Sequence, residues 1–171
     1  MVKMERLRSH FTEMGFTKVG TFIQSGNVFF QSESLDRAAL RSQIESRLKE
    51  GLGFEVPTTI RTLDEVRAAV ATDPFKGIEA GEDLRFVVVF TYDPVSIAGL
   101  DPKRAEAKGF TFLGQTDGEI FVLMRQDPGR PGNPVAFLEK ELNRKDRMTA
   151  RFFGATAKLL DAAEAHFGKP N

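Results

Sequence analysis

The chain has 171 residues, with 24 lysine and arginine side chains against 24 aspartates and glutamates, two histidines and no cysteine or tryptophan. A chain of this length can bury enough surface to fold without disulfide bonds or a bound metal. The lack of cysteine excludes disulfide scaffolds, thiolate metal sites and cysteine nucleophiles. The longest strongly apolar run, Phe86 to Thr91, is too short for a membrane span, and the first residues do not read as a signal peptide. We therefore expect a soluble cytoplasmic protein with no membrane partner.

The first half of the chain contains five predicted elements, two helices and three strands, and a closing helix. Apolar residues three and four apart predict a helix over about 4–14 that ends at Gly15. Gly26-Asn27 between two β-rich runs predicts a tight hairpin. A second helix is expected from about 40 to 51 and a strand from 54 to 60, near a sheet edge because it contains Pro57. The pair Thr62 and Glu65 makes a capping box for a helix that Asp73-Pro74 stops.

The second half begins after a polar segment, residues 76–83, which we interpret as a linker. Residues 84–92 are almost all apolar and predict a central strand buried on both faces. A short helix is expected after Asp101-Pro102, followed by a hairpin around Asp117-Gly118. Asn133-Pro134 opens another helix, an extended piece is expected near 148–152, and a last helix runs over about 155–167.

The two halves share one order of elements, except that the first half lacks an opening strand. The hairpin glycines Gly26 and Gly118 lie 92 residues apart, and so do the predicted starts of the last helices, at Thr62 and about Gly154. The fold prediction is α+β, a tandem pair of ferredoxin-like βαββαβα subdomains at 1–75 and 84–171. The strand at 84–92 has its counterpart immediately before Met1.

The missing strand would lie in the middle of its sheet, so its absence leaves two inner edges unpaired. Unpaired buried backbone groups cost about 1–3 kcal/mol each, which makes an empty central position expensive. Three explanations are open. The natural chain starts upstream of Met1, a neighbouring chain or loop fills the position, or the first half pairs differently. We favour an upstream start.

Residues 16–30, FTKVGTFIQSGNVFF, resemble the bacterial family called domain of unknown function 1697, whose members read Gly-Phe-Thr-Asp-Val-x-Thr-Tyr-Ile-Gln-Ser-Gly-Asn-Val-Val-Phe in this place. Asp73-Pro74-Phe75 and Thr149-Ala150-Arg151 are similar to further family motifs. The resemblance implies two related α+β subdomains and an opening strand that this chain lacks. It brings no catalytic residue and no cofactor. Phe152 and Phe153 stand where the family has Asn and Trp, which puts in doubt any ligand site built from that closing motif.

Four residues are candidate ligand contacts: Ser25, Asn27, Arg130 and Arg151. Ser25 and Asn27 could present polar groups to a ligand, although a hairpin turn explains the same residue types. Arg130 lies in a Pro-Gly-Arg-Pro-Gly loop before a helix N-terminus, an arrangement that holds anions or simply forms a surface loop. Arg151 is the best polar candidate, and an ion pair with a carboxylate such as Asp146 is its alternative explanation.

We expect no catalytic constellation, no metal site and no cofactor. Neither His10 nor His166 has partners at metal-ligand spacing, and no phosphate loop, dinucleotide fingerprint or nucleophile elbow is present. Whether the protein is an enzyme stays open.

The favoured function is a non-enzymatic binding or self-associating module, with a homo-oligomer as its expected assembly. The alternative is a small-anion or metabolite-binding protein, or an enzyme, with a site between the subdomains. Single-stranded RNA binding is a minor alternative, because Phe22 and Phe29 share a hairpin face. Both halves are electrically neutral, with equal numbers of acidic and basic residues in 1–80 and in 81–171, so we do not expect nucleic acid as a partner.

Overall fold

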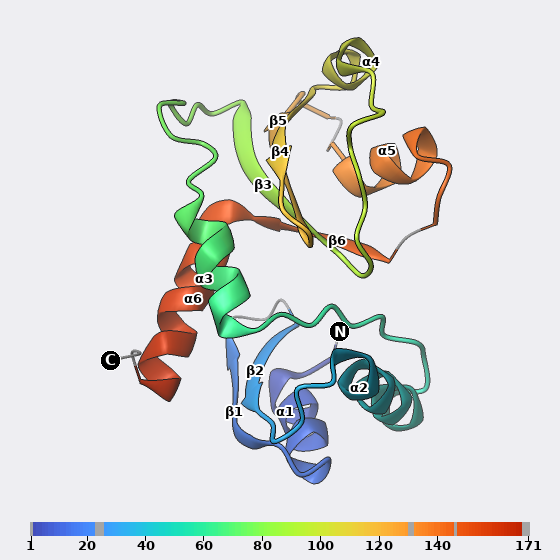
Figure 1. The fold of residues 1–171 in the computed structure, drawn as a ribbon, viewed down its shortest axis with the longest axis vertical. Helices are drawn as coiled ribbons and strands as arrows, with labels where there is room; N and C mark the ends of the chain where they lie inside the picture. The colour runs from blue at the N-terminus through green and yellow to red at the C-terminus, as the bar shows by residue number, and fades with distance from the viewer. Residues whose placement is uncertain (1, 23–25, 130–131, 146, 169–171) are drawn as a thin grey trace. The chain divides into compact units, whose positions relative to one another are not determined.

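The computed structural model describes residues 2–22, 26–129, 132–145 and 147–168. These residues form a mixed α+β structure with six helices, a two-stranded antiparallel sheet and a four-stranded antiparallel sheet (Figure 1). The chain divides into two compact units. The first contains Met1–Leu63 and Lys158–Asn171, and the second contains Asp64–Ala157.

The first unit consists of α1 (Met4–Glu13), the hairpin of β1 (Thr17–Phe22) and β2 (Asn27–Gln31), α2 (Arg37–Leu52) and the end of α6 (Phe153–Phe167). Asp36 caps α2, since its carboxylate accepts from the backbone N–H of Ala39, 3.0 Å away. Gly53 ends the helix with φ +83°, a conformation that glycine adopts without strain. Gly26, with φ +76°, has the positive φ expected of the hairpin turn.

The core of the first unit lies between the hairpin and the two helices. Its buried residues are Leu7, Phe11, Phe16, Leu40, Ile44 and Leu48. Val28 and Phe30 of β2 pack against this cluster, and so do Val56 and Ile60 from the stretch after α2. The helical spacing of the apolar residues predicted this face of α1 and α2.

The other face of the hairpin is covered by the end of α6. The ring of Phe29 lies 4.9 Å from that of His166 and 5.8 Å from that of Phe167, centroid to centroid. Nε2 of His166 hydrogen-bonds the carbonyl oxygen of Lys18 at 2.8 Å. The ring of Phe29 also lies against Gly20 of β1, where an added Cβ would come within 2.2 Å of it. Glycine at position 20 therefore leaves the space that the ring of Phe29 occupies between β1 and α6.

The second unit begins with α3 (Leu63–Ala71). It continues, in chain order, with β3 (Leu84–Thr91), α4 (Pro102–Ala107), β4 (Phe110–Gln115), β5 (Glu119–Arg125), α5 (Pro134–Glu141), β6 (Met148–Phe152) and the start of α6. The strand order is β4-β5-β3-β6, with antiparallel pairing throughout. Asp101 and Asn133 cap α4 and α5 as predicted, each followed by a proline. Thus β3 is a central strand, paired on both edges.

Both faces of this sheet are packed. On one face, Val87 and Val89 of β3 join the cluster that includes Ala105 of α4 and Leu138 of α5. On the other face, Val88 and Phe121 pack with Ala69 of α3 and with Phe75. The alternation of β3 side chains between two apolar layers explains why its sequence is apolar at successive positions.

Candidate functional site

The edge of β2 that faces away from β1 has no strand beside it among the described residues. The predicted duplication makes β5 of the second unit the counterpart of β2, since β5 begins at 119 and β2 at 27, a separation of 92 residues. At this offset, the side chains that face each core also match. Val28 and Phe30 pack against the core cluster of the first unit, and Ile120 and Val122 belong to a core cluster of the second.

Burial differs sharply between β2 and β5. Ile120, Phe121 and Val122 are 0–3% exposed, whereas residues 27–30 of β2 are all only partly buried. The second unit buries β5 by pairing it with β4 on one side and β3 on the other. β2 pairs with β1 alone among the described residues, which accords with its lower burial.

Hydrogen bonds at the two ends of β5 show which of its residues direct their backbone groups toward β3. The N–H of Arg125 donates to Gly109, just before β4, while the carbonyl of Gly118 accepts from Thr91, at the end of β3. Successive residues of an antiparallel strand point their backbone groups to opposite neighbours. Even-numbered residues of β5 therefore face β3. If the predicted duplication holds, Val28 and Phe30, which lie 92 residues before Ile120 and Val122, direct their N–H and C=O groups to the unpaired edge of β2.

The stretch 54–60, which was predicted to be a strand, forms neither helix nor strand. Figure 1 shows it drawn out between α2 and α3. The strand prediction was therefore wrong. No described strand pairs with this stretch, and an extended segment cannot form a ladder without a neighbouring strand.

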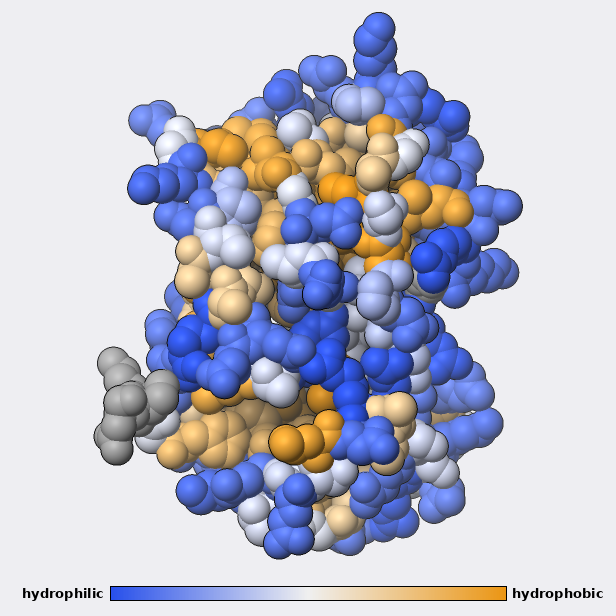
Figure 2. Space-filling view, viewed as in Figure 1, coloured by the Kyte–Doolittle hydropathy of each residue, from blue (hydrophilic) through white to orange (hydrophobic). Residues whose placement is uncertain are grey.

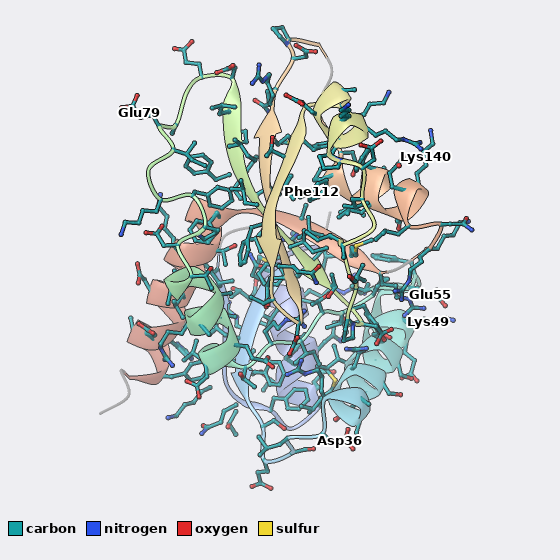
Figure 3. All side chains as sticks on the ribbon, turned by 45° about the horizontal axis from the view of Figure 1, so that its top comes forward. Asp36, Lys49, Glu55, Glu79, Phe112 and Lys140 are labelled. Carbon is teal, nitrogen blue, oxygen red and sulfur yellow. The ribbon has the colours of Figure 1, made fainter. Side chains whose placement is uncertain are left out.

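Two contacts tether this stretch to α2. The backbone N–H of Thr58 donates to Oε1 of Glu45 at 2.8 Å. Nζ of Lys49 lies 3.2 Å from Oε1 of Glu55, and Figure 3 shows these two side chains meeting at the end of α2. Both side chains of the second pair are largely exposed, so that pair adds little stability. The Glu45 contact was not predicted, because it links a helix surface to a backbone group whose position only the fold determines.

We call Val28 to Phe30 together with residues 54–60 the acceptor edge. Its two parts pack on the same core cluster, and Phe54, at its start, is 53% exposed. Figure 2 shows apolar atoms at the surface over β1 and β2. The acceptor edge thus combines unpaired strand backbone with partly exposed apolar side chains, the combination that favours pairing with a further strand.

Of the four predicted ligand residues, two lie in the described part of the chain, one in each compact unit. Asn27 is the first residue of β2, in the first unit, and pairs with Phe22. Arg151 lies in β6, in the second unit, opposite Val88. Ser25 and Arg130 lie outside the described residues, as does Asp146, the suggested ion-pair partner of Arg151. Their joint role in ligand binding stays a prediction.

Arg151 is half-buried and held by its own strand. Its Nη1 donates to Oγ1 of Thr149 at 2.6 Å and to the carbonyl of Ala150 at 2.9 Å. Desolvation by burial lowers the pKa of the guanidinium. The guanidinium stays protonated at physiological pH. A half-buried positive charge therefore lies beside the hydroxyl of Thr149.

The described part of the chain holds neither a metal-binding cluster nor a membrane-spanning helix. No three or more histidine, aspartate or glutamate side chains gather there as they would around a metal ion. None of the helices there has the length and apolar character needed to span a bilayer. For His166 the sequence predicted only that it has no partners at metal-ligand spacing. In the structure its hydrogen bond with Lys18 links α6 to β1.

The fold and the acceptor edge define a mixed α+β protein with an incompletely paired first sheet. The family model described as protein of unknown function (DUF1697) matches residues 1–121, and the chain belongs to this family. The match runs from α1 into β5 and confirms the family resemblance seen in residues 16–30. Comparison with curated proteins and with solved structures gave no match.

Proposed function

We propose that this protein is a non-enzymatic binding module, and that its acceptor edge binds an extended segment of polypeptide. The observation that carries the proposal is the contrast between β2 and β5, which are equivalent in the repeat but differ in having one and two paired neighbours. Addition of a strand to a free sheet edge is a common mode of peptide recognition, in which backbone hydrogen bonds supply affinity and side-chain pockets supply specificity.

The proposal includes a tandem architecture for the whole chain. In it, the halves 1–75 and 84–171 are related βαββαβα units, and the first lacks the strand equivalent to β3. Support comes from the starts of equivalent elements. Those of β1 and β4 lie 93 residues apart, those of β2 and β5 lie 92 apart, and those of α3 and α6 lie 90 apart. The strand order of the second unit, β4-β5-β3-β6, is the one expected of a βαββαβ unit with its first strand in the middle.

A small-anion site at Arg151 is the second candidate function. The half-buried guanidinium beside the Thr149 hydroxyl favours it. This candidate ranks lower because Nη1 already donates to two oxygens of the same strand.

The test of the proposed function is a proline substitution at the acceptor edge. Val28→Pro removes an N–H that faces the open side of β2 while leaving the pairing of β2 with β1 intact, and proline is tolerated on strand edges of this kind. Val28→Thr, which keeps the N–H and the side-chain shape, is the matched control. Binding of a panel of ten-residue extended peptides, apolar and polar, is measured by calorimetry and by amide protection.

We expect at least one peptide to bind and to protect the amides of Val28 and Phe30. Loss of a hydrogen bond together with a steric block predicts that Val28→Pro weakens this binding by roughly 10-fold or more, whereas Val28→Thr changes it little. Equal binding by Val28→Pro and the unchanged chain contradicts the proposal, as does a panel in which no peptide protects either amide.

A further inference from the structure

One of the two histidines of the chain, His10 of α1, is buried without a polar partner. Its side chain is 8% exposed, and neither ring nitrogen has a hydrogen-bond partner among the described residues. A neutral imidazole offers one donor and one acceptor, and buried groups of this kind are nearly always hydrogen-bonded. The imidazole of His10 is therefore held in its place by packing alone.

The ring lies against the last turn of α2, the helix beside α1 in the first unit (Figure 1). A Cβ added to Gly51 would come within 3.0 Å of Cε1, Nε2 and Nδ1, so both nitrogens of the ring are directed at this part of the α2 backbone. The carbonyl oxygen of Gly51 already accepts from Nη2 of Arg6 at 2.6 Å. Arg6 and His10 of α1 thus meet α2 at the same residue.

The charged groups at this junction leave no carboxylate for the ring. On α1, Arg6 lies four residues before His10 and Glu13 three residues after it, which places both on the same side of the helix. Glu13 forms an ion pair with Arg47 of α2. The other ionisable groups of the last turn of α2 and of the stretch after it are paired as well, Glu50 with Arg47 and Lys49 with Glu55.

Protonation of His10 in this position is unfavourable for two reasons. The imidazolium has two donors and would lose its hydration without gaining an acceptor. It would also lie beside the guanidinium of Arg6, a like charge that is already bonded to the C-terminal end of α2. A charged ring gains hydration and distance from Arg6 when it leaves Gly51.

We propose that His10 is an acid-sensitive junction between α1 and α2. The neutral ring packs on Gly51, and the protonated ring leaves it, so that the last turn of α2 separates from α1. This inference goes beyond the proposed function and does not depend on it. The junction lies next to the core of the first unit, because Leu7 and Phe11 of α1 belong to the same cluster as Leu48 of α2.

The other histidine lacks this property. Nε2 of His166 lies 2.8 Å from the carbonyl oxygen of Lys18. A neutral ring with its hydrogen on Nε2 and a charged ring can both donate to this carbonyl, so acid leaves the contact between α6 and β1 in place.

The sign of the pH dependence follows from proton binding. An unfolded chain binds the proton at His10 without the cost of burial, so in acid the unfolded state binds more protons than the folded one. The contribution of His10 to stability is therefore complete above the ordinary titration range of histidine, about pH 6 to 7, and is lost as the pH falls through and below it.

The test compares the thermal unfolding midpoint of the full chain at about pH 7.5 and about pH 5.5, on either side of this range. His10→Gln removes the titrating ring, and His166→Gln is the matched control, since the chain has no third histidine. On acidification we expect the unchanged chain and His166→Gln to lose roughly 4 °C more than His10→Gln does. An equal loss in all three proteins, or a loss that only His166→Gln abolishes, overturns the proposal.

A second measurement needs no substitution at His10 and decides the question even if His10→Gln does not fold. The N–H of Gly53 donates to the carbonyl of Lys49 in the last turn of α2, and its protection against exchange is followed together with the ring signals of His10. We expect protection at Gly53 to fall when the ring becomes charged, while that of Val122 in β5 is retained. A charged His10 ring with Gly53 still fully protected contradicts the proposal.

Discussion

His10 and Gly51 form a tight contact between α1 and α2. His10 is 8% exposed, and neither of its ring nitrogens has a hydrogen-bond partner among the described residues. A Cβ on Gly51 would lie 2.3 Å from Cε1 of the ring and 2.7 Å from Nε2. The imidazole therefore serves as packing, and the space it needs is provided by the missing side chain at position 51.

Gly51→Ala is expected to destabilise the protein, although alanine in a helix usually stabilises by about 1 kcal/mol relative to glycine. Overpacking costs about 1–3 kcal/mol, and the buried ring has little room to move. We expect a net loss of about 1 kcal/mol in the free energy of unfolding, measured by denaturant titration. Ser46→Ala, on the exposed side of the same helix, is the control and should change little.

A double-mutant cycle identifies the cause. In a His10→Ala background the clash is gone, so Gly51→Ala should become neutral or stabilising. If Gly51→Ala costs the same in both backgrounds, contact with His10 is not what requires glycine at position 51.

At the scale of elements, the stretch 54–60 depends on α2 for its position. The carboxylate of Glu45 accepts from the backbone N–H of Thr58, and hydrogen bonds to a charged acceptor are stronger than neutral ones. The contact fixes one residue of a segment that has no ladder of its own.

Glu45→Ala should release Thr58. We expect the amide of Thr58 to exchange with solvent roughly 10-fold faster or more, with a loss of about 1–2 kcal/mol in the free energy of unfolding. Glu45→Gln retains an acceptor oxygen and should show a smaller effect on both. Unchanged exchange at Thr58 in Glu45→Ala means that the segment is held by its apolar contacts, Val56 and Ile60, instead.

Elements with local signals were predictable from sequence, and those that depend on distant partners were not. The spacing of Leu40, Ile44 and Leu48 predicted the buried face of α2, and Asp101 and Asn133 predicted the starts of α4 and α5. Apolar and polar residues alternate over 54–60, as they do in a strand, but no described strand pairs with this stretch. The lack of a pairing partner cannot be seen in the local sequence. The same limit applies to Phe29, whose cover by the end of α6 joins residues more than 130 positions apart.

At the scale of the whole molecule, the boundaries between the two compact units fall at the start of α3 and inside α6. α6 starts in the second unit and ends in the first. Its start meets Phe121 and its end meets Phe29. The duplication, in which each final helix would close its own half, stays a prediction from the order of elements in the sequence.

We propose that β2 has an open edge where β5, its counterpart in the proposed duplication, is paired, and amide hydrogen exchange tests this most directly. The amides compared are those of Val28 and Phe30 with those of Ile120 and Val122, their equivalents 92 residues later. Amides without a strand partner exchange through local fluctuations, whereas those inside a paired sheet require larger opening. The account predicts exchange at Val28 and Phe30 at least about 100-fold faster than at Ile120 and Val122. Equal protection of the two pairs in the isolated monomeric chain would mean that β2 already has a neighbour, and the account of an acceptor edge would be wrong.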